Sequence, residues 1–214
     1  MLVKDRMSRH PITVTTDVRI DEALKMMRDN KIRRLPVVDK NGRLVGIVSE
    51  MDLLYASPSP ATSLSVYEIH YLMARITVQD VMTKEVISVE EDTPLEEAAR
   101  IMVDNKIGGL PVVRNDTLVG IITETDLFKI FLELLGAREK GVRLTLQTPN
   151  KKGVLASITG QIAKMGGDII SLGTFLGEDP TEGLITVKVA EVPQDQLVEA
   201  LETPETKLVD VRES

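Results

Sequence analysis

The sequence predicts a mixed protein of the α/β (α+β) class, with a duplicated unit followed by a smaller domain of different pattern. Residues 29–38 and 104–113 carry the same ten-residue phrase, with eight identities. Each copy alternates β-prone runs with apolar residues at helical spacing, and the pattern changes from about residue 141. Two copies are too few for a solenoid, which needs three or more repeats, so we expect a paired module.

Composition excludes several classes of function. The chain has 214 residues, a formal net charge of −7, two histidines and no cysteine. An acidic chain is a poor partner for nucleic acid or an anionic membrane, because neutralising phosphates needs a basic surface. Disulfides, thiolate nucleophiles and Cys-ligated metals are excluded. With only two histidines and no cysteine, we expect no metal site. Since no basic-then-apolar leader and no uncharged stretch of about 18 residues occurs, we expect a cytoplasmic protein.

Each repeat is predicted to run strand, helix, strand, strand, helix. In the first copy a short β-prone run at 11–14 precedes a helix over about 18–30. Continuous apolar runs at 35–38 and 44–48 are joined by Asp39-Lys40-Asn41-Gly42, and the Asn-Gly pair predicts a hairpin. The second copy has a turn that is one residue shorter and lacks glycine, so we expect a different turn geometry.

Two segments carry helix-start signals. Thr93-Pro94-Leu95-Glu96 predicts a helix capped by the Thr93 hydroxyl, and in the first copy Asp17 is the candidate cap. Between the repeats we predict a linker, 56–77, with a loop and then a helix that ends near Arg75. Tyr67 and Tyr71 on this helix are packing residues or, alternatively, a ligand lid.

Residues 127–135 form a predicted amphipathic helix that Gly136 can end. Phe128 and Phe131 on it indicate either a partner surface or a buried core. Beyond it, the predicted order is strand, helix, strand, strand, helix, strand. This βαββαβ order is typical of a small ferredoxin-like domain.

One repeated motif has side chains that could bind a ligand: a glycine, a hydroxyl residue three positions later and an aspartate three positions after that. It occurs as Gly46, Ser49 and Asp52 in one copy, and its second occurrence ends in Thr123 and Asp126. The hydroxyl can donate to a phosphate or sugar oxygen, the carboxylate can accept from both ribose hydroxyls, and a helix amino terminus favours an anion. Alternatively, the hydroxyl and carboxylate are only helix caps.

On the Leu-Pro-Val-Val strand and the Gly-x-x-Ser/Thr-x-x-Asp signature, the chain resembles a tandem pair of CBS domains. The resemblance implies a pseudo-twofold pair with two clefts for adenosyl ligands such as AMP, ATP or S-adenosylmethionine. It implies ribose contacts, hydroxyl contacts, base-contacting segments and first-strand hydroxyls at these positions: Asp52 and Asp126; Ser49 and Thr123; Arg33, Arg34, Leu35 and Pro36 with Gly108, Gly109, Leu110 and Pro111; and Thr13 and Ser88.

The two copies differ where Arg33-Arg34 in one corresponds to Gly108-Gly109 in the other. We expect one cleft beside guanidinium groups and one beside bare backbone, so the clefts should be unequal. Arginine suits phosphate because its fork binds in a bidentate way. The alternative is a solvated arginine pair at a helix–strand junction.

The last domain resembles an ACT domain, a regulatory module that often binds amino acids at dimer interfaces. The resemblance implies a ligand set of Asn150, Lys151, Gly153 and Asp168. Asn150, Lys152 and Asp168 replace the Asp, Pro and Asn that are usual in that family. These departures favour dimerisation or relay over amino-acid binding.

The expected domains are CBS domain 1 at 1–55, the linker, CBS domain 2 at 78–136 and the ACT domain at 137–214, an order that resembles the bacterial acetoin-utilisation protein B family. We expect a homodimeric, non-catalytic sensor of an adenosyl ligand, in acetoin or carbon metabolism, acting on an unknown regulated protein. We find no activated nucleophile and no phosphate-binding glycine loop. The alternatives are a structural oligomerisation protein with vestigial clefts and an amino-acid sensor.

Overall fold

The structure is a computed structural model that describes residues 1–57, 65, 75–177 and 179–213. Most of the predicted inter-repeat loop and helix, including Tyr67 and Tyr71, lies outside the described residues. The chain forms two compact units, Met1–Leu127 and Phe128–Ser214. Within the described ranges, no helix is both long enough and apolar enough to cross a bilayer.

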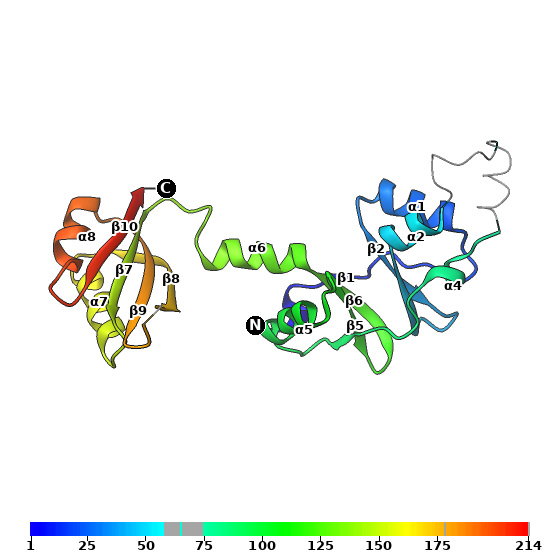
Figure 1. Cartoon of the computed structure of the whole chain (residues 1–214), viewed down its shortest axis with the longest axis horizontal. Coiled ribbons are helices and arrows are strands. Elements are labelled where there is room, and N and C mark those ends of the chain that lie inside the picture. Colours follow the sequence, from blue (N-terminus) through cyan, green and yellow to red (C-terminus); the bar gives the residue numbers. More distant parts are fainter. Residues whose placement is uncertain (58–64, 66–74, 178, 214) are drawn as a thin grey trace. The chain divides into compact units, whose positions relative to one another are not determined.

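Repeat 1 consists of helix α1 (Ile20–Asp29), strands β2 (Arg34–Val38) and β3 (Leu44–Ser49), and helix α2 (Glu50–Ala56), which lie together in Figure 1. The predicted helix and both apolar runs are confirmed. The predicted strand at 11–14 is reduced to one bridge, in which Val14 pairs with Val37. The apolar stripe of α1 buries Ile20, Ala23 and Met27 against this core.

Repeat 2 consists of α5 (Leu95–Asn105), β5 (Gly109–Arg114) and β6 (Thr117–Thr123), and the start of α6 (Glu124–Leu134) follows. Here the first strand is longer: β4 (Val89–Glu90) runs parallel to β5. Together with β1 (Ser8–Arg9) these strands form a sheet in the order β1-β6-β5-β4.

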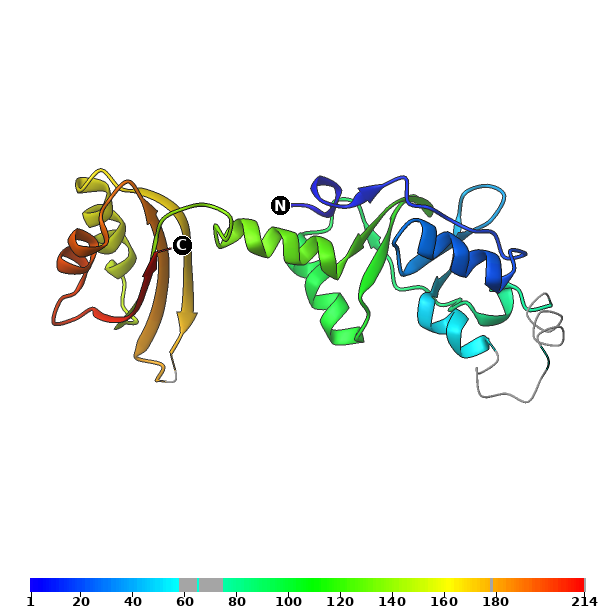
Figure 2. The ribbon, with the colours of Figure 1, turned by 90° about the horizontal axis from the view of Figure 1, so that it is seen from above.

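The segment that leads into each repeat packs on the other repeat. At the N-terminus, the 3-10 helix η1 (Val3–Asp5) is anchored by a hydrogen bond of 2.9 Å from the Val3 amide to the Thr93 carbonyl. Next, Ser8 in β1 pairs with Ile121 in β6. The N-terminal segment, dark blue in Figure 2, therefore belongs structurally to repeat 2.

The segment that leads into repeat 2 packs in the same way on repeat 1. Helix α4 (Val78–Val81) places Val78 in the core of repeat 1, and the Val78 amide donates to the Val18 carbonyl at 2.8 Å. Thr83 then pairs with Ile47 on β3 through two backbone bonds of 2.9 and 3.0 Å. Each repeat thus completes the fold of the other.

The two hairpin turns differ, as the sequence predicts. In the turn of repeat 1, residues 39–42, only Gly42 has a positive φ, +78°, and Oδ1 of Asp39 accepts hydrogen bonds from the amides of Asn41 and Arg43. In repeat 2, Asn115 and Asp116 both have a positive φ, at 48° and 63°. The second turn therefore has the two left-handed residues of a type I′ turn.

The predicted caps at both helix starts are wrong. Helix α5 begins directly after Pro94, and within the described chain neither Pro94 nor Thr93 provides a side-chain cap. Asp17 accepts from the Thr15 hydroxyl at 2.5 Å, two residues before the Arg19 that precedes α1. A proline at the cap position has a fixed backbone that enters a helix without a side-chain acceptor.

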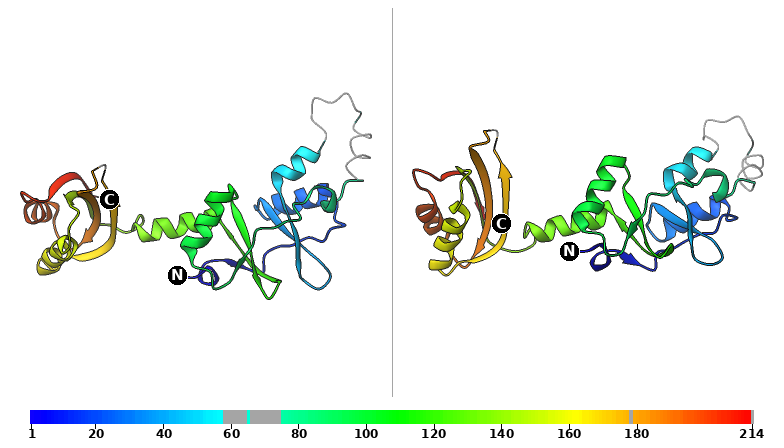
Figure 3. Two further views of the ribbon diagram at one scale, coloured as in Figure 1. Left: turned by 60° about the horizontal axis from the view of Figure 1, so that its bottom comes forward. Right: turned by 90° about the horizontal axis from the view of Figure 1, so that it is seen from below.

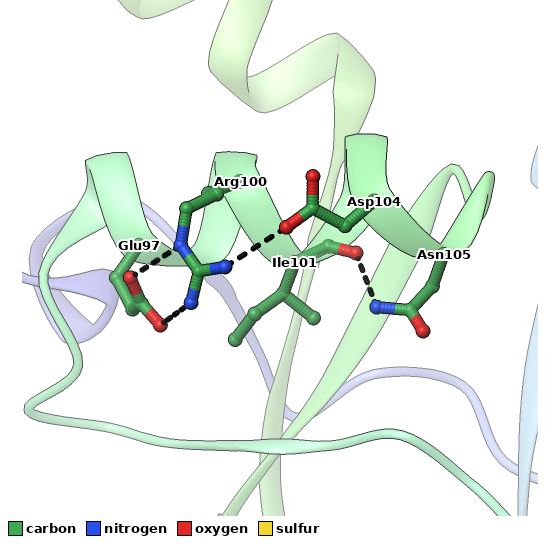
Figure 4. A network of polar contacts seen from close by, with 5 residues as sticks. All are labelled: Glu97, Arg100, Ile101, Asp104 and Asn105. Carbon is green, nitrogen blue, oxygen red and sulfur yellow. Dashed lines mark hydrogen bonds and ion pairs between the residues drawn. The ribbon is translucent and has the colours of Figure 1, made fainter.

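The outer face of α5 carries a network of polar contacts, shown in Figure 4. The Arg100 guanidinium donates to Glu97 and, at 2.8 Å, to Asp104. The Asn105 amide donates to the Ile101 carbonyl at 2.8 Å, and Asn30, its counterpart in the shared phrase, does the same to Met26. The ion pairs are exposed, so water and salt screen them and they add little stability.

Unit 2 has the predicted βαββαβ order. Its helices α7 and α8 lie on one face of an antiparallel sheet of order β10-β7-β9-β8 (Figures 1 and 3). The elements are β7 (Val142–Pro149), α7 (Val154–Lys164), β8 (Asp168–Leu176), β9 (Glu182–Ala190), α8 (Gln194–Leu201) and β10 (Lys207–Glu213). Alternate residues of β7, from Val142 to Leu146, face the core beneath these helices.

Gly136 ends helix α6, as predicted. Gly136 has a φ of +57°, and its amide and that of Ala137 bond back to Glu133 and Leu132, which is a Schellman motif. The Lys188 ammonium, 3% exposed, donates to the Gly136 carbonyl at 3.0 Å. This bond holds the end of α6 on the sheet of unit 2.

Phe128 and Phe131 on α6 are exposed, at 67% and 55%. The alternative of a buried core for these two side chains is therefore not what the structure has.

Candidate functional site

The hydroxyl and carboxylate of each signature form a capping box at a helix start. In repeat 1 the Ser49 hydroxyl and amide donate to Oδ2 of Asp52 at 2.7 and 2.8 Å, and the Asp52 amide donates back to the hydroxyl. In repeat 2, Thr123 donates to Oδ2 of Asp126 in the same way. The capping alternative is thus real, and Oδ1 of Asp52 receives none of these bonds.

The hairpin register places Arg34 beside this box. Arg34 at the start of β2 is the cross-strand partner of Ser49 at the end of β3. In repeat 2 the corresponding partner of Thr123 is Gly109. The same register therefore places an arginine side chain beside the capping box in repeat 1 and a glycine without a side chain beside it in repeat 2.

A cleft of about 290 Å³ opens where the two repeats meet, close to the lower end of the range for ligand-binding clefts. Repeat 1 contributes Arg34, Ile47, Ser49 and Asp52. The leading segment of repeat 2 and its α5–β5 junction contribute the rest of the lining: Thr83, Glu85, Val86, Ile87, Lys106, Ile107, Gly108 and Gly109.

Five predicted ligand residues line this one cleft: Arg34, Ser49, Asp52, Gly108 and Gly109. This corrects the expectation that the arginine pair and the glycine pair lie beside separate clefts. The repeats meet through their strand ends, so the α5–β5 junction of repeat 2 faces the β2 start of repeat 1. The cleft is composite, and the differing positions of the phrase meet in it.

Gly108 is the point of contact. A Cβ atom built there overlaps the Arg34 guanidinium and lies 2.7 Å from Oε2 of Glu124. The Glu124 amide donates to the Gly108 carbonyl at 3.2 Å, which fixes the start of α6 at this junction. Burial lowers the pKa of the half-buried Arg34 guanidinium from its ordinary value, and the nearby Glu124 opposes this shift. Arg34 still carries its charge.

Four residues of the predicted base-contacting segments are core residues. Leu35 and Leu110 are 0% exposed, and Pro36 and Pro111 are also buried. Their side chains hold the strands in place, so any ligand contact from these four residues comes from their backbone.

The remaining predicted residues, Thr13, Arg33, Thr123 and Asp126, do not line the composite cleft. Ser88 lines a different cleft of about 410 Å³ beside the hairpin turns. Asp126 and Thr123 occupy in repeat 2 the place that Asp52 and Ser49 occupy in repeat 1.

Sequence reasoning missed Lys106, Thr83 and residues 85–87. Lys106 has a left-handed φ of +54°, as does Lys31 in the first copy, and left-handed residues other than glycine are uncommon. The identical lysine in both phrases was the available signal. The segment 83–87 gives no local signal, because it reaches the cleft only through the exchange between repeats.

The glycines of the Gly-x-x-Ser/Thr-x-x-Asp signature, Gly46 and Gly120, make room for the strand exchange, in which the segment leading into one repeat packs on the other repeat. A Cβ on Gly46 would lie 2.5 Å from the Met82 sulfur and 3.2 Å from the Thr83 carbonyl. A Cβ on Gly120 would contact Met7 and the Ser8 carbonyl in the same way. The close backbone approach that a glycine permits is therefore made here by the segment that leads into the other repeat.

In unit 2 the predicted ACT ligand set is divided. Asn150 donates from its side chain to the Pro180 carbonyl, and Lys151 forms an ion pair of 2.7 Å with Glu205. Gly153 precedes α7 at the same end of the sheet, with a φ of +90°.

Asp168 pairs with Ala190 at the other end of β9, eight residues from Glu182. At about 3.3 Å per residue the two ends are roughly 25 Å apart. Helix α7 returns the chain to the opposite end of the sheet, so one protomer does not bring the four residues to one amino acid.

No group of three or more His, Cys, Asp or Glu residues that could hold a metal ion occurs in the part of the chain that the structure describes. The polar groups of the composite cleft are instead two cations, two carboxylates, hydroxyls and backbone. Such a set suits an organic anion with hydroxyl groups.

The fold defines a pair of repeats with a composite cleft between them, and the comparisons with known proteins agree with such a paired module. The CBS-domain family model matches residues 3–59 and 78–133, more than half of the chain. The chain belongs to the CBS-domain family, as a tandem pair.

Solved structures extend this similarity. A protein from Vibrio cholerae assigned to acetoin utilization is 39% identical over 65% of this chain and 96% of its own, with a TM-score of 0.54. The CBS pair of protein MJ0100, solved with 5′-methylthioadenosine and S-adenosylmethionine, is 33% identical over 65% and 98% (TM-score 0.52). CBSX2 of Arabidopsis thaliana with AMP is 32% identical over 61% and 96% (TM-score 0.52).

Proposed function

We propose that this protein is a non-catalytic regulator that binds an adenosyl ligand in the composite cleft of its CBS pair. The carrying observation is that Ser49 and Asp52 of one repeat share a cleft with the Gly108-Gly109 backbone of the other. Similar CBS pairs were solved with AMP, 5′-methylthioadenosine and S-adenosylmethionine, which supports an adenosyl ligand here.

In this proposal Oδ1 of Asp52 accepts from the ribose hydroxyls, while Oδ2 keeps the helix cap. The adenine lies against the backbone of Gly108 and Gly109, where the absence of side chains allows close approach. Arg34 and Lys106 face the anionic end of the ligand. Thr123 and Asp126 have the equivalent roles in a second, pseudo-symmetric site.

We assign unit 2 to the ACT type, with the domain limits expected from the sequence. The βαββαβ order and the sheet order β10-β7-β9-β8 support this assignment. We propose that the ACT domain dimerises or relays the state of the CBS pair to a regulated protein. The similarity to the protein from Vibrio cholerae supports a role in acetoin or carbon metabolism.

Calorimetric titration of the full chain with AMP, ATP, S-adenosylmethionine, 5′-methylthioadenosine and NAD tests this function. We expect micromolar to millimolar binding of at least one adenosyl ligand. Asp52→Ala should weaken the site in the composite cleft by tenfold or more, about 1.4 kcal/mol. Asp126→Ala removes the same kind of helix cap outside the cleft, so it should leave this site unchanged.

No heat with any of these compounds would favour a structural oligomerisation protein instead. Product formed from AMP or ATP above a heat-killed control would contradict the non-catalytic assignment. Equal weakening of one site by both aspartate substitutions would show that the effect is loss of a cap.

A further inference from the structure

Arg34 and Glu124 lie on the same side of Gly108, one from each repeat. The guanidinium and the carboxylate both occupy the space that a side chain at residue 108 would fill. Arg34 is half-buried and lines the cleft, while Glu124 begins α6 and is not among the lining residues. The carboxylate therefore lies close enough to attract the guanidinium, and Glu124 correspondingly raises the pKa of Arg34 against the effect of burial.

This arrangement occurs once in the CBS pair. The counterparts of Arg34, Gly108 and Glu124 under the sequence repeat are Gly109, Arg33 and Glu50. In the equivalent place on the other side of the pair, Gly109 therefore stands where Arg34 would be, and Arg33, with its long side chain, stands where Gly108 would leave open space. Backbone geometry is shared, since the Glu50 amide donates to the Arg33 carbonyl as the Glu124 amide does to Gly108.

A phosphate group would compete well for this guanidinium. Arginine binds phosphate through two parallel hydrogen bonds, and a phosphate monoester carries more charge than one carboxylate. An arginine that lies beside a carboxylate gives up part of that attraction when it turns to a bound anion. A neutral or cationic ligand has nothing to offer in that exchange.

We propose that Arg34 binds the 5′-phosphate of an adenine nucleotide and that Glu124 is an internal competitor that occupies Arg34 when the cleft is empty. The cleft then selects 5′-phosphorylated adenosine over neutral or sulfonium-bearing adenosyl compounds. This inference rests on the proposed function, because it assumes that an adenosyl ligand binds in the composite cleft.

Titrations of the full chain with AMP and 5′-methylthioadenosine, which share adenosine and differ in the phosphate, test the inference. Arg34→Gln should weaken AMP by tenfold or more, the loss expected for a charged hydrogen bond, and change 5′-methylthioadenosine less than twofold. Glu124→Gln should strengthen AMP by about threefold to fivefold, the range of a partly exposed ion pair, and leave 5′-methylthioadenosine unchanged.

The double variant and a charge-matched variant control the result. In the presence of Arg34→Gln, the effect of Glu124→Gln on AMP should vanish, because the two act through one pair. Glu96→Gln, an exposed acid in the first turn of α5, makes the same change in net charge and should leave both affinities unaltered.

Equal loss of AMP and 5′-methylthioadenosine in Arg34→Gln, or weaker AMP binding in Glu124→Gln, would overturn the phosphate inference and leave the proposed function standing. If the wild-type protein binds neither compound nor any other adenosyl ligand, both fail.

Discussion

Repeat 1 and repeat 2 have the same order of elements and the same capping box, yet they contribute different parts to one cleft. Repeat 1 contributes a cation and the Ser49–Asp52 box, and repeat 2 contributes glycine backbone. The arginine fits because its counterpart surface has no side chain at Gly108. The difference teaches that a duplicated module can diverge by complementary substitution, with the two changed positions facing each other.

The exchange of leading segments also makes the stability of one repeat depend on the other. If each repeat completes the other, the two should unfold together although their strands differ in length. Leu35→Ala and Leu110→Ala remove equivalent side chains that are fully buried. Each should cost roughly 2–5 kcal/mol of unfolding free energy.

Hydrogen exchange of the full chain, followed peptide by peptide in mild denaturant, measures this first effect. We expect loss of protection across both repeats in both variants, and little change in β7 to β10. Loss confined to the substituted repeat would show that the two fold independently.

Gly46→Val and Gly120→Val test the exchange at its two crossing points. Each valine would crowd a methionine and a carbonyl of the leading segment, at the cost of about 1–3 kcal/mol expected for overpacking. Denaturant unfolding should show similar losses for both. Gly160→Ala, in α7 with open space around it, is the matched control and should be neutral or slightly stabilising.

The hairpin turns should respond in opposite directions. Gly42→Ala forces a side chain into a φ of +78° and should cost roughly 1 kcal/mol. Asp116→Gly relieves a residue at +63° and should stabilise by up to about 1 kcal/mol, since type I′ turns favour Asn-Gly. The melting temperatures of the two variants test this prediction. A change in the same direction for both would contradict the assigned turn geometries.

The smallest expected effect is on the loss of stability at low pH. The backbone hydrogen bond from Arg43 lowers the pKa of Asp39 below its ordinary value of 3.8. A lowered folded-state pKa means that the stabilisation is present above pH 3.8 and is lost as the pH falls below it.

Asp39→Asn should therefore reduce the drop in melting temperature between pH 5 and pH 3. Asp116→Asn, at the tip of the other hairpin, makes the same change in charge and should alter that drop less. An unchanged drop in Asp39→Asn would mean that this turn does not contribute to acid sensitivity.

Local patterns predicted most of the elements because their signals lie within a few residues. The stripe of α1, the end of α6 at Gly136 and the βαββαβ order of unit 2 all depend on spacing or on a single glycine. The caps were mispredicted at Thr93 and Asp17, which lie two and three residues before the first helical residues, Leu95 and Ile20. Cap choice depends on backbone angles that spacing does not encode.

The sequence by itself determined that a unit was duplicated, where most of its strands and helices lie, and which two positions differ within the shared ten-residue phrase. Only the tertiary structure decided that Arg34 and Gly108 meet in one cleft, that Leu35 and Leu110 are core, and that Thr83 and residues 85–87 line the site. The physical reason is that secondary structure follows from neighbours in the chain, whereas this cleft joins segments about 75 residues apart. Their proximity results from strand exchange, which leaves no periodic trace in either repeat.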